Sequence, residues 1–282
     1  MKKHLSTILL IAVFLIGLSL LLYPSVSDYW NSFHQSRAIA GYSRQVAQLE
    51  GESCDRLWQA AEAYNRALRS RQNVYRLTQE QKAEYESLLN VSGNGIIGYI
   101  EIPSIGCSLP IYHGTDEAVL QIAVGHIAGT SLPVGGQGTH CALSGHRGLP
   151  SAKLFTDLDK MVDGDIFVLR VLDETLTYVV DRILIVEPYE MDALEIEAGK
   201  DYCTLVTCTP YGINTHRLLV RGHRIENIAQ AKIVRVTADA VQIEPLIVAP
   251  VVAIPLLLLL LILLLLPGQP KKKHGGDPDD DF

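Results

Sequence analysis

The hydrophobic pattern places two long apolar runs at the ends of the chain and a mixed segment between them. Residues 5–23 are almost wholly apolar and follow Lys2 and Lys3, and residues 245–267 form a second run that precedes three lysines at 271–273. Each run has about 20 residues, enough to cross a bilayer core of about 30 Å. Because lysines flank the outer end of each run, we expect both termini to be cytoplasmic and the middle segment to be extracytoplasmic. An alternative for the first run is a cleaved signal peptide, although no A-x-A-like site follows it closely.

The segment after the first run has a helical pattern. From residue 25 to about residue 92, apolar residues recur at intervals of three and four, as in "DRLWQAAEAYNRALRSRQ". This periodicity predicts two or three amphipathic helices. Thr78 followed by Gln81 has the spacing of a capping box and predicts that one helix begins there.

From Asn94 to about Ile228 the pattern changes to short β-rich runs separated by Gly, Pro and Asp. Such a series predicts a β-barrel or a β-sandwich. The expected strands are 98–102, 107–112, 140–144, 165–171, 175–186, 203–207 and 216–224, with short helices at 116–123 and 151–161.

These patterns predict six segments along the chain. They are an N-terminal transmembrane anchor or signal (1–24), a helical extension (25–94), a β domain (95–228), a linker (229–244), a C-terminal transmembrane helix (245–267) and a charged cytoplasmic tail (268–282). We expect the tail to be disordered because it is rich in charge, Gly and Pro.

Composition narrows the function classes. The net charge is −7, and no basic stripe with interleaved aromatic residues is present, which argues against nucleic-acid binding. The five cysteines are an odd number, so at least one thiol stays free in an exported domain. No C-x-x-C occurs, and no cysteine spacing matches a zinc ligand set. Cys203 and Cys208 are five residues apart on one expected strand, which points their side chains to opposite faces and argues against a disulfide between them.

Cys208 stands out because it ends a β-branched run, "TLVTC", just before a turn. A thiolate nucleophile needs a nearby base or cation, and the end of a strand leaves its sulfur accessible. The "TPYGINTH" loop returns the chain as an antiparallel strand, which brings Arg217 near Cys208. His146 also follows a β run and precedes a Gly turn, in "LSGHRG". Cys, His and Arg at three strand ends predict an acyl-transfer site.

Three motifs in this order resemble those of the sortases, the membrane-bound cysteine transpeptidases of Gram-positive bacteria. The motifs are "TLVTC", "LSGHRG" and "HRLLVRGHR", and the resemblance covers roughly residues 95–225. It implies a mainly β, closed barrel in which Cys208 is the nucleophile, His146 the acid or base, and Arg217 the oxyanion or substrate clamp. Thr207 is either a strand former or a hydrogen-bonding residue of the substrate groove. A resting thiolate–imidazolium pair and a neutral pair are both compatible with these residues.

The layout resembles the class C, pilin-polymerising branch, which has an N-terminal helical region and a second membrane span. This implies cleavage of an LPxTG-type sorting signal between Thr and Gly, with transfer of the acyl group to a pilin lysine and no metal or organic cofactor. The partners would be pilin subunits, the membrane and, for a housekeeping-type sortase, the lipid-linked cell-wall precursor. A cysteine hydrolase and a non-enzymatic membrane adaptor are the rival classes of function.

Several choices remain open at the level of single residues. Arg221 is the main rival of Arg217, because residues four apart on a strand point to the same face. Class C sortases often carry a lid with an Asp followed by an aromatic residue, but "RSRQNVYRLTQEQ" contains no Asp, so a lid here would be built differently, for example around Tyr75. The histidines that rival His146 are His113, His126, His140, His216 and His223. Cys107, Cys141 and Cys203 are interpreted as structural.

Overall fold

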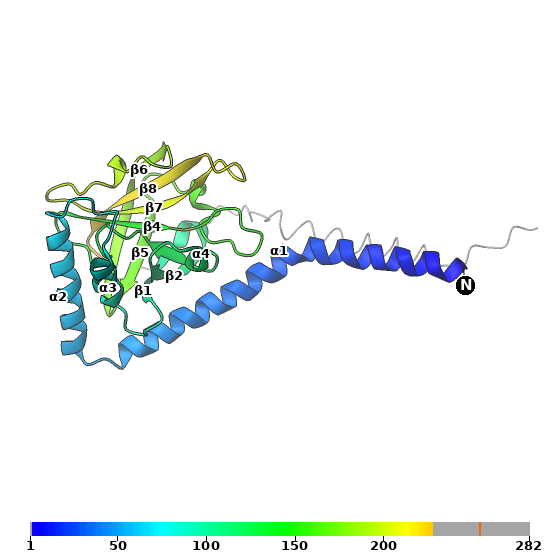
Figure 1. Ribbon diagram of the computed structural model, residues 1–282, viewed down its shortest axis with the longest axis horizontal. Coiled ribbons are helices and arrows are strands. Elements are labelled where there is room, and N and C mark those ends of the chain that lie inside the picture. The colour runs from blue at the N-terminus through cyan, green and yellow to red at the C-terminus, as the bar shows by residue number, and fades with distance from the viewer. Residues whose placement is uncertain (1, 228–253, 255–282) are drawn as a thin grey trace, which may run out of the picture. The chain divides into compact units, whose positions relative to one another are not determined.

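The computed structural model describes residues 2–227 and residue 254 (Figure 1). The predicted linker at 229–244, the second membrane span at 245–267 and the charged tail therefore lie outside the described residues, apart from Ile254. Residues 2–25 and residues 26–227 belong to two separate compact units, and each is described by itself.

Three helices precede the first strand. They are α1 (Lys2–Ala47), α2 (Gly51–Leu68) and α3 (Gln79–Ser87). The capping box is confirmed: the Gln81 amide donates to Thr78 Oγ1 at 3.3 Å, and the Thr78 amide donates to Gln81 Oε1 at 2.9 Å. Among the described residues, one helical stretch, Leu9–Ala47 in α1, is long and apolar enough to cross a membrane, by length and composition alone.

Eight strands form a closed barrel in the order β1-β2-β3-β4-β7-β8-β6-β5. The barrel, not the sandwich, is therefore the architecture of the β domain. Two neighbouring pairs are parallel, β2 with β3 and β4 with β7, and the others are antiparallel. The strands are β1 (Ile96–Ile102), β2 (Cys107–His113), β3 (Val124–His126), β4 (Thr139–Ser144), β5 (Ile166–Val171), β6 (Glu174–Val186), β7 (Asp201–Thr209) and β8 (His216–Ile225).

The expectations about local structure need some correction. All seven expected strands are present, but β3 was not expected, because three residues are too few to show an alternating pattern. The helix expected over 116–123 is present only as the short α4 (Glu117–Leu120). The helix expected over 151–161 is wrong: that segment is mostly turns, with one 3₁₀ turn at Leu158–Lys160. Leu154 has a φ of 38°, which interrupts a right-handed helical path.

The helical extension is attached to the barrel by buried polar contacts. The hydroxyl of Tyr42 in α1 donates to Ile97 O at 3.1 Å and accepts from the Leu172 amide at 2.8 Å. Asn65 in α2 donates to Leu132 O at 3.0 Å and accepts from the Leu132 amide at 2.7 Å. Burial raises the pKa of Tyr42 to about 12, so its hydroxyl stays protonated and can donate at any physiological pH. Residues 26–47 and α2 are therefore fixed parts of the barrel unit.

A pair of histidines, the buried His126 and the partly buried His113, packs under α3. Tyr85 of α3 stacks edge-on against His113, with ring centroids 4.8 Å apart, and its hydroxyl lies 2.8 Å from His126 Nδ1. Neither ring nitrogen of His113 makes a hydrogen bond to the described residues. Burial and the neighbouring His126 lower the pKa of His113 to about 4, while backbone groups nearby act weakly in the opposite direction.

We predict that His113 makes stability depend on pH. Its unfolded pKa is about 6.5, so between pH 6.5 and 4 the unfolded chain binds a proton that the folded chain does not. The contribution of His113 is therefore complete above pH 6.5 and is lost as the pH falls toward 4, by up to about 3 kcal/mol. Denaturant unfolding of wild type and His113→Phe at several pH values measures this. Wild type should lose stability relative to the variant on acidification, and parallel curves would contradict the prediction.

Candidate active site

Cys208 and Arg217 face each other across two strands. Cys208 lies near the end of β7, Arg217 near the start of β8, and the two are direct partners in the antiparallel register. Directly opposed residues in such a pair have Cβ atoms about 5 Å apart on the same face of the sheet. Both residues are partly exposed. The thiol and the guanidinium therefore share one accessible surface.

His146 follows β4 by two residues, and β4 lies on the other side of β7 from β8. Strand β4 pairs with β7 in parallel as far as Ser144 opposite Val206, and the Gly145 amide continues this pairing by donating to Val206 O at 3.1 Å. Extending the register by two residues sets His146 opposite Cys208. Side chains support this extension, because Arg147 Nη1 lies 3.4 Å from Thr209 Oγ1. The structure therefore pairs Cys208 with Arg217 directly, and the meeting of His146 with these two side chains stays a prediction that the extended register supports.

A cavity of about 210 Å³ lies next to Cys208 and Arg217. Its lining includes Val206 and Leu219, which are two positions from Cys208 on β7 and from Arg217 on β8, and Ser144, the last residue of β4, two positions before His146. Because residues i and i+2 of a strand share a face, the cavity lies on the same face of the sheet as Cys208 and Arg217.

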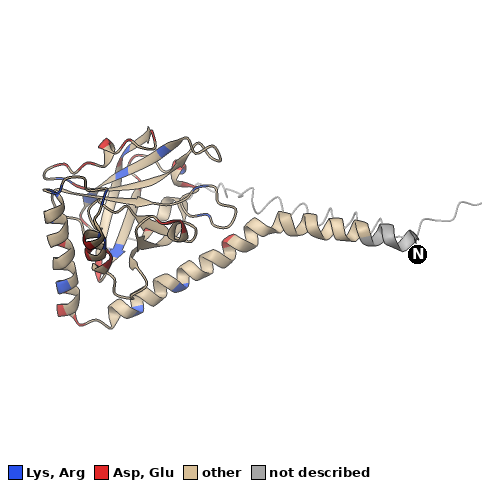
Figure 2. Cartoon of the chain, in the orientation of Figure 1, with Lys and Arg blue, Asp and Glu red and all other residues tan. Residues whose placement is uncertain are grey.

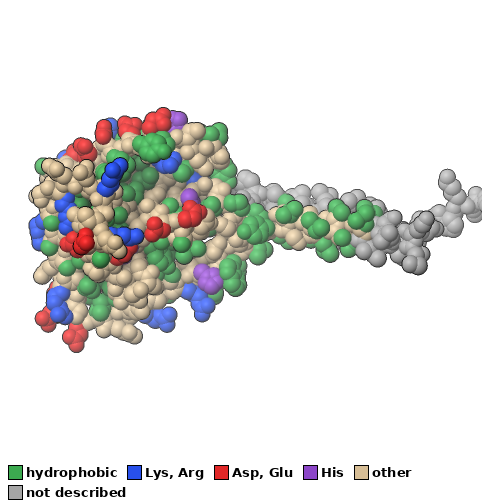
Figure 3. Space-filling model, viewed as in Figure 1, with side chains coloured by type: hydrophobic (Ala, Val, Ile, Leu, Met, Phe, Trp, Pro, Cys, Tyr) green, Lys and Arg blue, Asp and Glu red, His purple; other side chains and the backbone are tan. Residues whose placement is uncertain are grey.

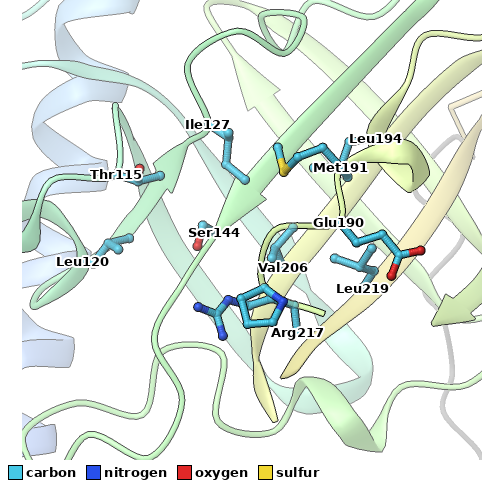
Figure 4. A pocket seen from close by; sticks show the side chains of 11 residues that line it. Thr115, Leu120, Ile127, Ser144, Glu190, Met191, Leu194, Val206, Arg217 and Leu219 are labelled. Carbon is cyan, nitrogen blue, oxygen red and sulfur yellow. The ribbon is translucent and has the colours of Figure 1, made fainter. Parts of the chain in front are cut away.

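Opposite walls of the cavity come from different parts of the chain. Figure 4 shows Thr115 and Leu120 on one side, Met191 and Leu194 on the other, and Arg217 at one end. Met191 and Leu194 belong to the β6–β7 connection, which also contributes Pro188 and Glu190. Of the three candidate catalytic residues, Arg217 lines this cavity, and Cys208 is its direct partner on the neighbouring strand. A mostly apolar groove next to a thiol and a guanidinium suits an extended peptide with an electrophilic carbonyl.

The comparisons with known proteins agree with this geometry. A family model described as the Sortase domain matches residues 100–225. The crystal structure of sortase C1 from Streptococcus agalactiae is 48% identical, and the match covers 68% of this chain and 100% of that one, with a TM-score of 0.67. The chain belongs to the sortase family of cysteine transpeptidases.

Further relatives support the same assignment. Sortase C of Streptococcus pneumoniae is 44% identical, with 68% of this chain and 97% of that chain covered and a TM-score of 0.61. Sortase A of Bacillus anthracis is 31% identical over 127 residues, or 45% of this chain and 59% of that protein. Sortase D of Bacillus subtilis is 29% identical over 131 residues and is matched over 63% of its length. The chain thus spans about three fifths of these two curated relatives.

The side chain of Thr207 contacts Gly145, the residue before His146 in this sortase. Its side chain is 1% exposed, and its hydroxyl donates to Gly145 O at 2.8 Å. The hydroxyl predicted to contact substrate therefore has a partner in the protein, and a contact with substrate stays a prediction. The contact that the structure shows ties β7 to the residue before His146.

The residues after His146 form a compact turn that fixes its position. The Phe155 amide donates to His146 O at 3.1 Å, and the Phe155 ring packs so closely on Gly145 that an added Cβ there would lie 2.7 Å from a ring carbon. The ring is fully buried, so it has no room to withdraw. Only glycine fits beside Phe155 at position 145.

We predict that Gly145→Ala lowers stability by about 1–3 kcal/mol, the usual cost of overpacking, and displaces His146. Denaturant unfolding and peptide turnover of the variant would measure both effects. Gly41→Ala is the matched control, because Gly41 lies in α1 with nothing within 4 Å of the added Cβ. That control should gain about 0.5–1 kcal/mol from helix propensity. If Gly145→Ala and Gly41→Ala changed the free energy of unfolding equally and only slightly, the tight packing of Phe155 on Gly145 would be contradicted.

Sequence reasoning missed a group of residues that brace the three site segments. Arg147 forms an ion pair with Asp159, and its guanidinium lies 5.8 Å from the centroid of the Tyr211 ring. The same ring approaches Gly148, where a Cβ would lie 3.1 Å away. The β7–β8 loop is thereby packed against the histidine segment. The only signal in the sequence was that Arg147 directly follows His146.

The rivals considered from the sequence have different partners. Arg221 forms an ion pair with Asp181 at 3.0 Å and lies 4.1 Å from the centroid of the Tyr202 ring. The ring nitrogens of His140 are bound to Thr204 Oγ1 and Glu195 O, at 2.8 and 2.9 Å. The remaining rivals pair elsewhere: His126 with Tyr85 and Ser131, His216 with Glu187, and His223 with Asp181, while His113 is packed under α3.

The segment where class C sortases often carry a lid lies against the barrel in this sortase. Residues 69–78 join α2 to α3, and Val74 O and the Tyr75 ring crowd Gly129, where a Cβ would lie 2.3 and 3.0 Å from them. Arg69 fastens the start of the segment by donating to Gly138 O at 2.9 Å. Among the described residues that line the cavity, none belongs to this segment.

Proposed function

We propose that this sortase is a class C enzyme that cleaves an LPxTG-type sorting signal and joins the new carboxyl end to a pilin lysine. The observation that supports the proposal is the direct pairing of Cys208 with Arg217 beside a mostly apolar cavity that Arg217 lines, with His146 two residues beyond the last β4–β7 pair. Each residue type supplies one part of acyl transfer, as the nucleophile, the proton carrier and the fixed cation.

In the first half-reaction the thiolate of Cys208 attacks the carbonyl carbon of the signal's Thr. A tetrahedral intermediate forms, and its oxygen carries the negative charge. Arg217 donates hydrogen bonds to that oxygen or to the adjoining substrate backbone. His146 gives its proton to the glycine nitrogen as the carbon–nitrogen bond breaks, which leaves a thioester on Cys208 and a free amine.

In the second half-reaction a lysine ε-amine attacks the thioester. His146 accepts a proton from the attacking nitrogen, and the sulfur of Cys208 leaves as the thiolate. The product is an isopeptide bond, and the enzyme returns to its starting state. This chemistry calls for no metal or cofactor, because an amide is exchanged for another amide.

The pilin assignment rests on the relatives and on the helical extension. The structure of Streptococcus pneumoniae sortase C is described as giving insight into pilin substrate specificity, and sortase C1 of a group B Streptococcus pilus island is 39% identical with a TM-score of 0.63. These matches cover 68–70% of this chain, more than the barrel alone. We therefore assign pilin subunits as the substrates and the lysine of a pilin as the acceptor.

We also propose that the enzyme is held in the cell membrane with its catalytic unit on the extracytoplasmic face. The apolar part of α1 supports an N-terminal anchor. We propose the second span at 245–267 from the length of its apolar run, and cytoplasmic positions for both termini from the lysines that flank the two runs.

The test uses the full chain in detergent with an LPxTG-type peptide and a lysine peptide from a pilin. Intact-mass spectrometry and peptide mapping should find a thioester on Cys208, which the lysine peptide converts to an isopeptide product. Water-only products with every amine would instead indicate a hydrolase. A product formed with a cell-wall precursor amine but not with the lysine peptide would indicate the housekeeping role.

A further inference from the structure

One face of α1 is attached to the barrel between residues 27 and 35. Ser27 and Asn31 both donate to Ser151 O, at 3.1 and 2.7 Å. Asp28 accepts from the Lys153 amide at 2.7 Å, and Gln35 donates to Ile122 O at 2.8 Å. Positions 27, 28, 31 and 35 lie on one side of a helix, so this side is fixed against the catalytic unit.

The remaining surface of this stretch carries large apolar side chains in the open. Val26, Tyr29, Trp30 and Phe33 follow the i, i+3, i+4, i+7 spacing of a helical stripe and are 63%, 75%, 63% and 48% exposed. We call these four residues the aromatic stripe. Hydrophobic side chains are visible along α1 in the space-filling view (Figure 3).

The charges beside the stripe are arranged for a surface of lipid headgroups. From residue 4 to residue 36 the only charged side chain is Asp28, whose carboxylate accepts from the Lys153 amide of the barrel unit. The coloured part of α1 is mostly tan in Figure 2. The first cation after the stripe is Arg37, whose guanidinium lies 5.2 Å from the centroid of the Phe33 ring. His34 packs against Trp30, with ring centroids 4.9 Å apart.

The chain limits how far the stripe can lie from a membrane. The apolar run ends at Tyr23, three residues before Val26, and three residues span at most about 10 Å in any conformation. Trp30 lies four residues further along the helix, a rise of about 6 Å. The headgroup layer on each side of the hydrocarbon core is about 5–7 Å thick. Along a continuous helix Trp30 lies about 10 Å beyond Tyr23, so this stretch must tilt by about 50° from the membrane normal to bring Trp30 into that layer.

We propose that the aromatic stripe binds the interfacial layer of the bilayer and docks the catalytic unit on the membrane surface. Trp and Tyr favour this layer because their rings are apolar while their N–H and O–H groups can contact water and headgroups. The opposite face of the same helix holds Ser151 and Lys153, which belong to the turn between His146 and Phe155. Docking would therefore fix the height of the active site above the membrane. This inference rests on the proposed membrane anchoring.

Membrane docking of the stripe can be tested by tryptophan fluorescence, because the chain has one tryptophan in the stripe and one outside it. Trp30 and Trp58 are the only tryptophans, and Trp58 lies on α2. The full chain with Trp58→Phe reports on Trp30 alone, and Trp30→Phe, which reports on Trp58, is the matched control. Both are reconstituted in phosphatidylglycerol-containing vesicles, with or without lipids brominated near the headgroup end of the acyl chain. Bromine quenches only rings close to it, so emission should fall for Trp30 and stay unchanged for Trp58.

The outcomes separate this inference from anchoring. The first check is flotation of each variant with the vesicles after an alkaline wash, together with peptide turnover to show that the fold is intact. A variant that floats but whose Trp30 emission is untouched by bromine would overturn the docking of the stripe and leave the anchor standing. Unquenched Trp30 together with crosslinking of two chains through the stripe would assign the stripe to a second copy instead. Failure to float would overturn the anchor and the docking together.

Discussion

Cys208→Ala is expected to lower peptide turnover about 10⁴-fold or more, because the covalent route is lost with the nucleophile. The substitution removes one sulfur at a partly exposed position between Val206 and Pro210, so the barrel should keep its stability. Turnover is measured by the release of the glycine-containing fragment, and the fold by the unfolding midpoint.

Cys107→Ala is the matched control for this experiment. Cys107 begins β2, and its sulfur lies 4.0 Å from Leu154 O. Burial raises the pKa of its thiol to about 12, so it is protonated at neutral pH and cannot act as a nucleophile there. The control should retain most of the turnover. A Cys208→Ala enzyme that still formed a thioester would place the nucleophile on another cysteine.

The alternation along strands is what made most of the site predictable from the sequence. A β-branched run ends in Cys208, and after a turn a second strand begins near Arg217. The length of the loop limits the register between these two strands. The structure pairs these two residues directly. The same local reasoning could not pair β4 with β7, because they are 57 residues apart and parallel, with two strands between them in sequence. His146 was found by its motif, and only the fold explains why the end of β4 lies next to β7.

The contacts that hold the site could not be predicted, because they join segments far apart in the chain. Thr207 looks like an ordinary strand residue until its hydroxyl is seen to bind Gly145 O. Phe155 was expected on a helix, yet its ring fills the space that a side chain at 145 would need. The expected helix over 151–161 failed for a related reason: burial of Phe155 and Leu158 in the core outweighs local helix propensity.

For the helical extension, too, the sequence predicted the elements but not the contacts between them and the rest of the protein. Its periodicity predicted helices correctly, but periodicity identifies an apolar face without naming what covers it. In α1, Tyr42 is packed against the barrel and is 2% exposed. Among the described residues, the four of the aromatic stripe stay 48–75% exposed. The difference becomes visible only when the contacts of both faces are known.

Arg217→Ala is expected to lower kcat by about 10²–10³-fold, the usual effect of removing an oxyanion donor. Arg217→Lys should restore only part of that loss, since an ammonium keeps the charge but lacks the planar pair of donors. The guanidinium is available to bind substrate, because the hydrogen bonds it makes to described residues are to the carbonyls of Asn214 and His216, at 3.3 and 3.1 Å. Both bonds come from one nitrogen, Nη1, which leaves further donors for a substrate.

Arg221 provides the matched control for Arg217, because it lies on the same strand and the same face four residues away. Its guanidinium is bound to Asp181 and packed on Tyr202, so Arg221→Lys should change the unfolding midpoint more than kcat. A steady-state comparison of the two lysine variants separates the roles. If Arg217→Lys and Arg221→Lys lowered kcat equally, Arg217 would act only as one of the positive charges on β8. It would then not act through hydrogen bonds at the reacting carbonyl. A larger loss for Arg217→Lys would assign the effect to the geometry of its donors, which only position 217 holds opposite Cys208.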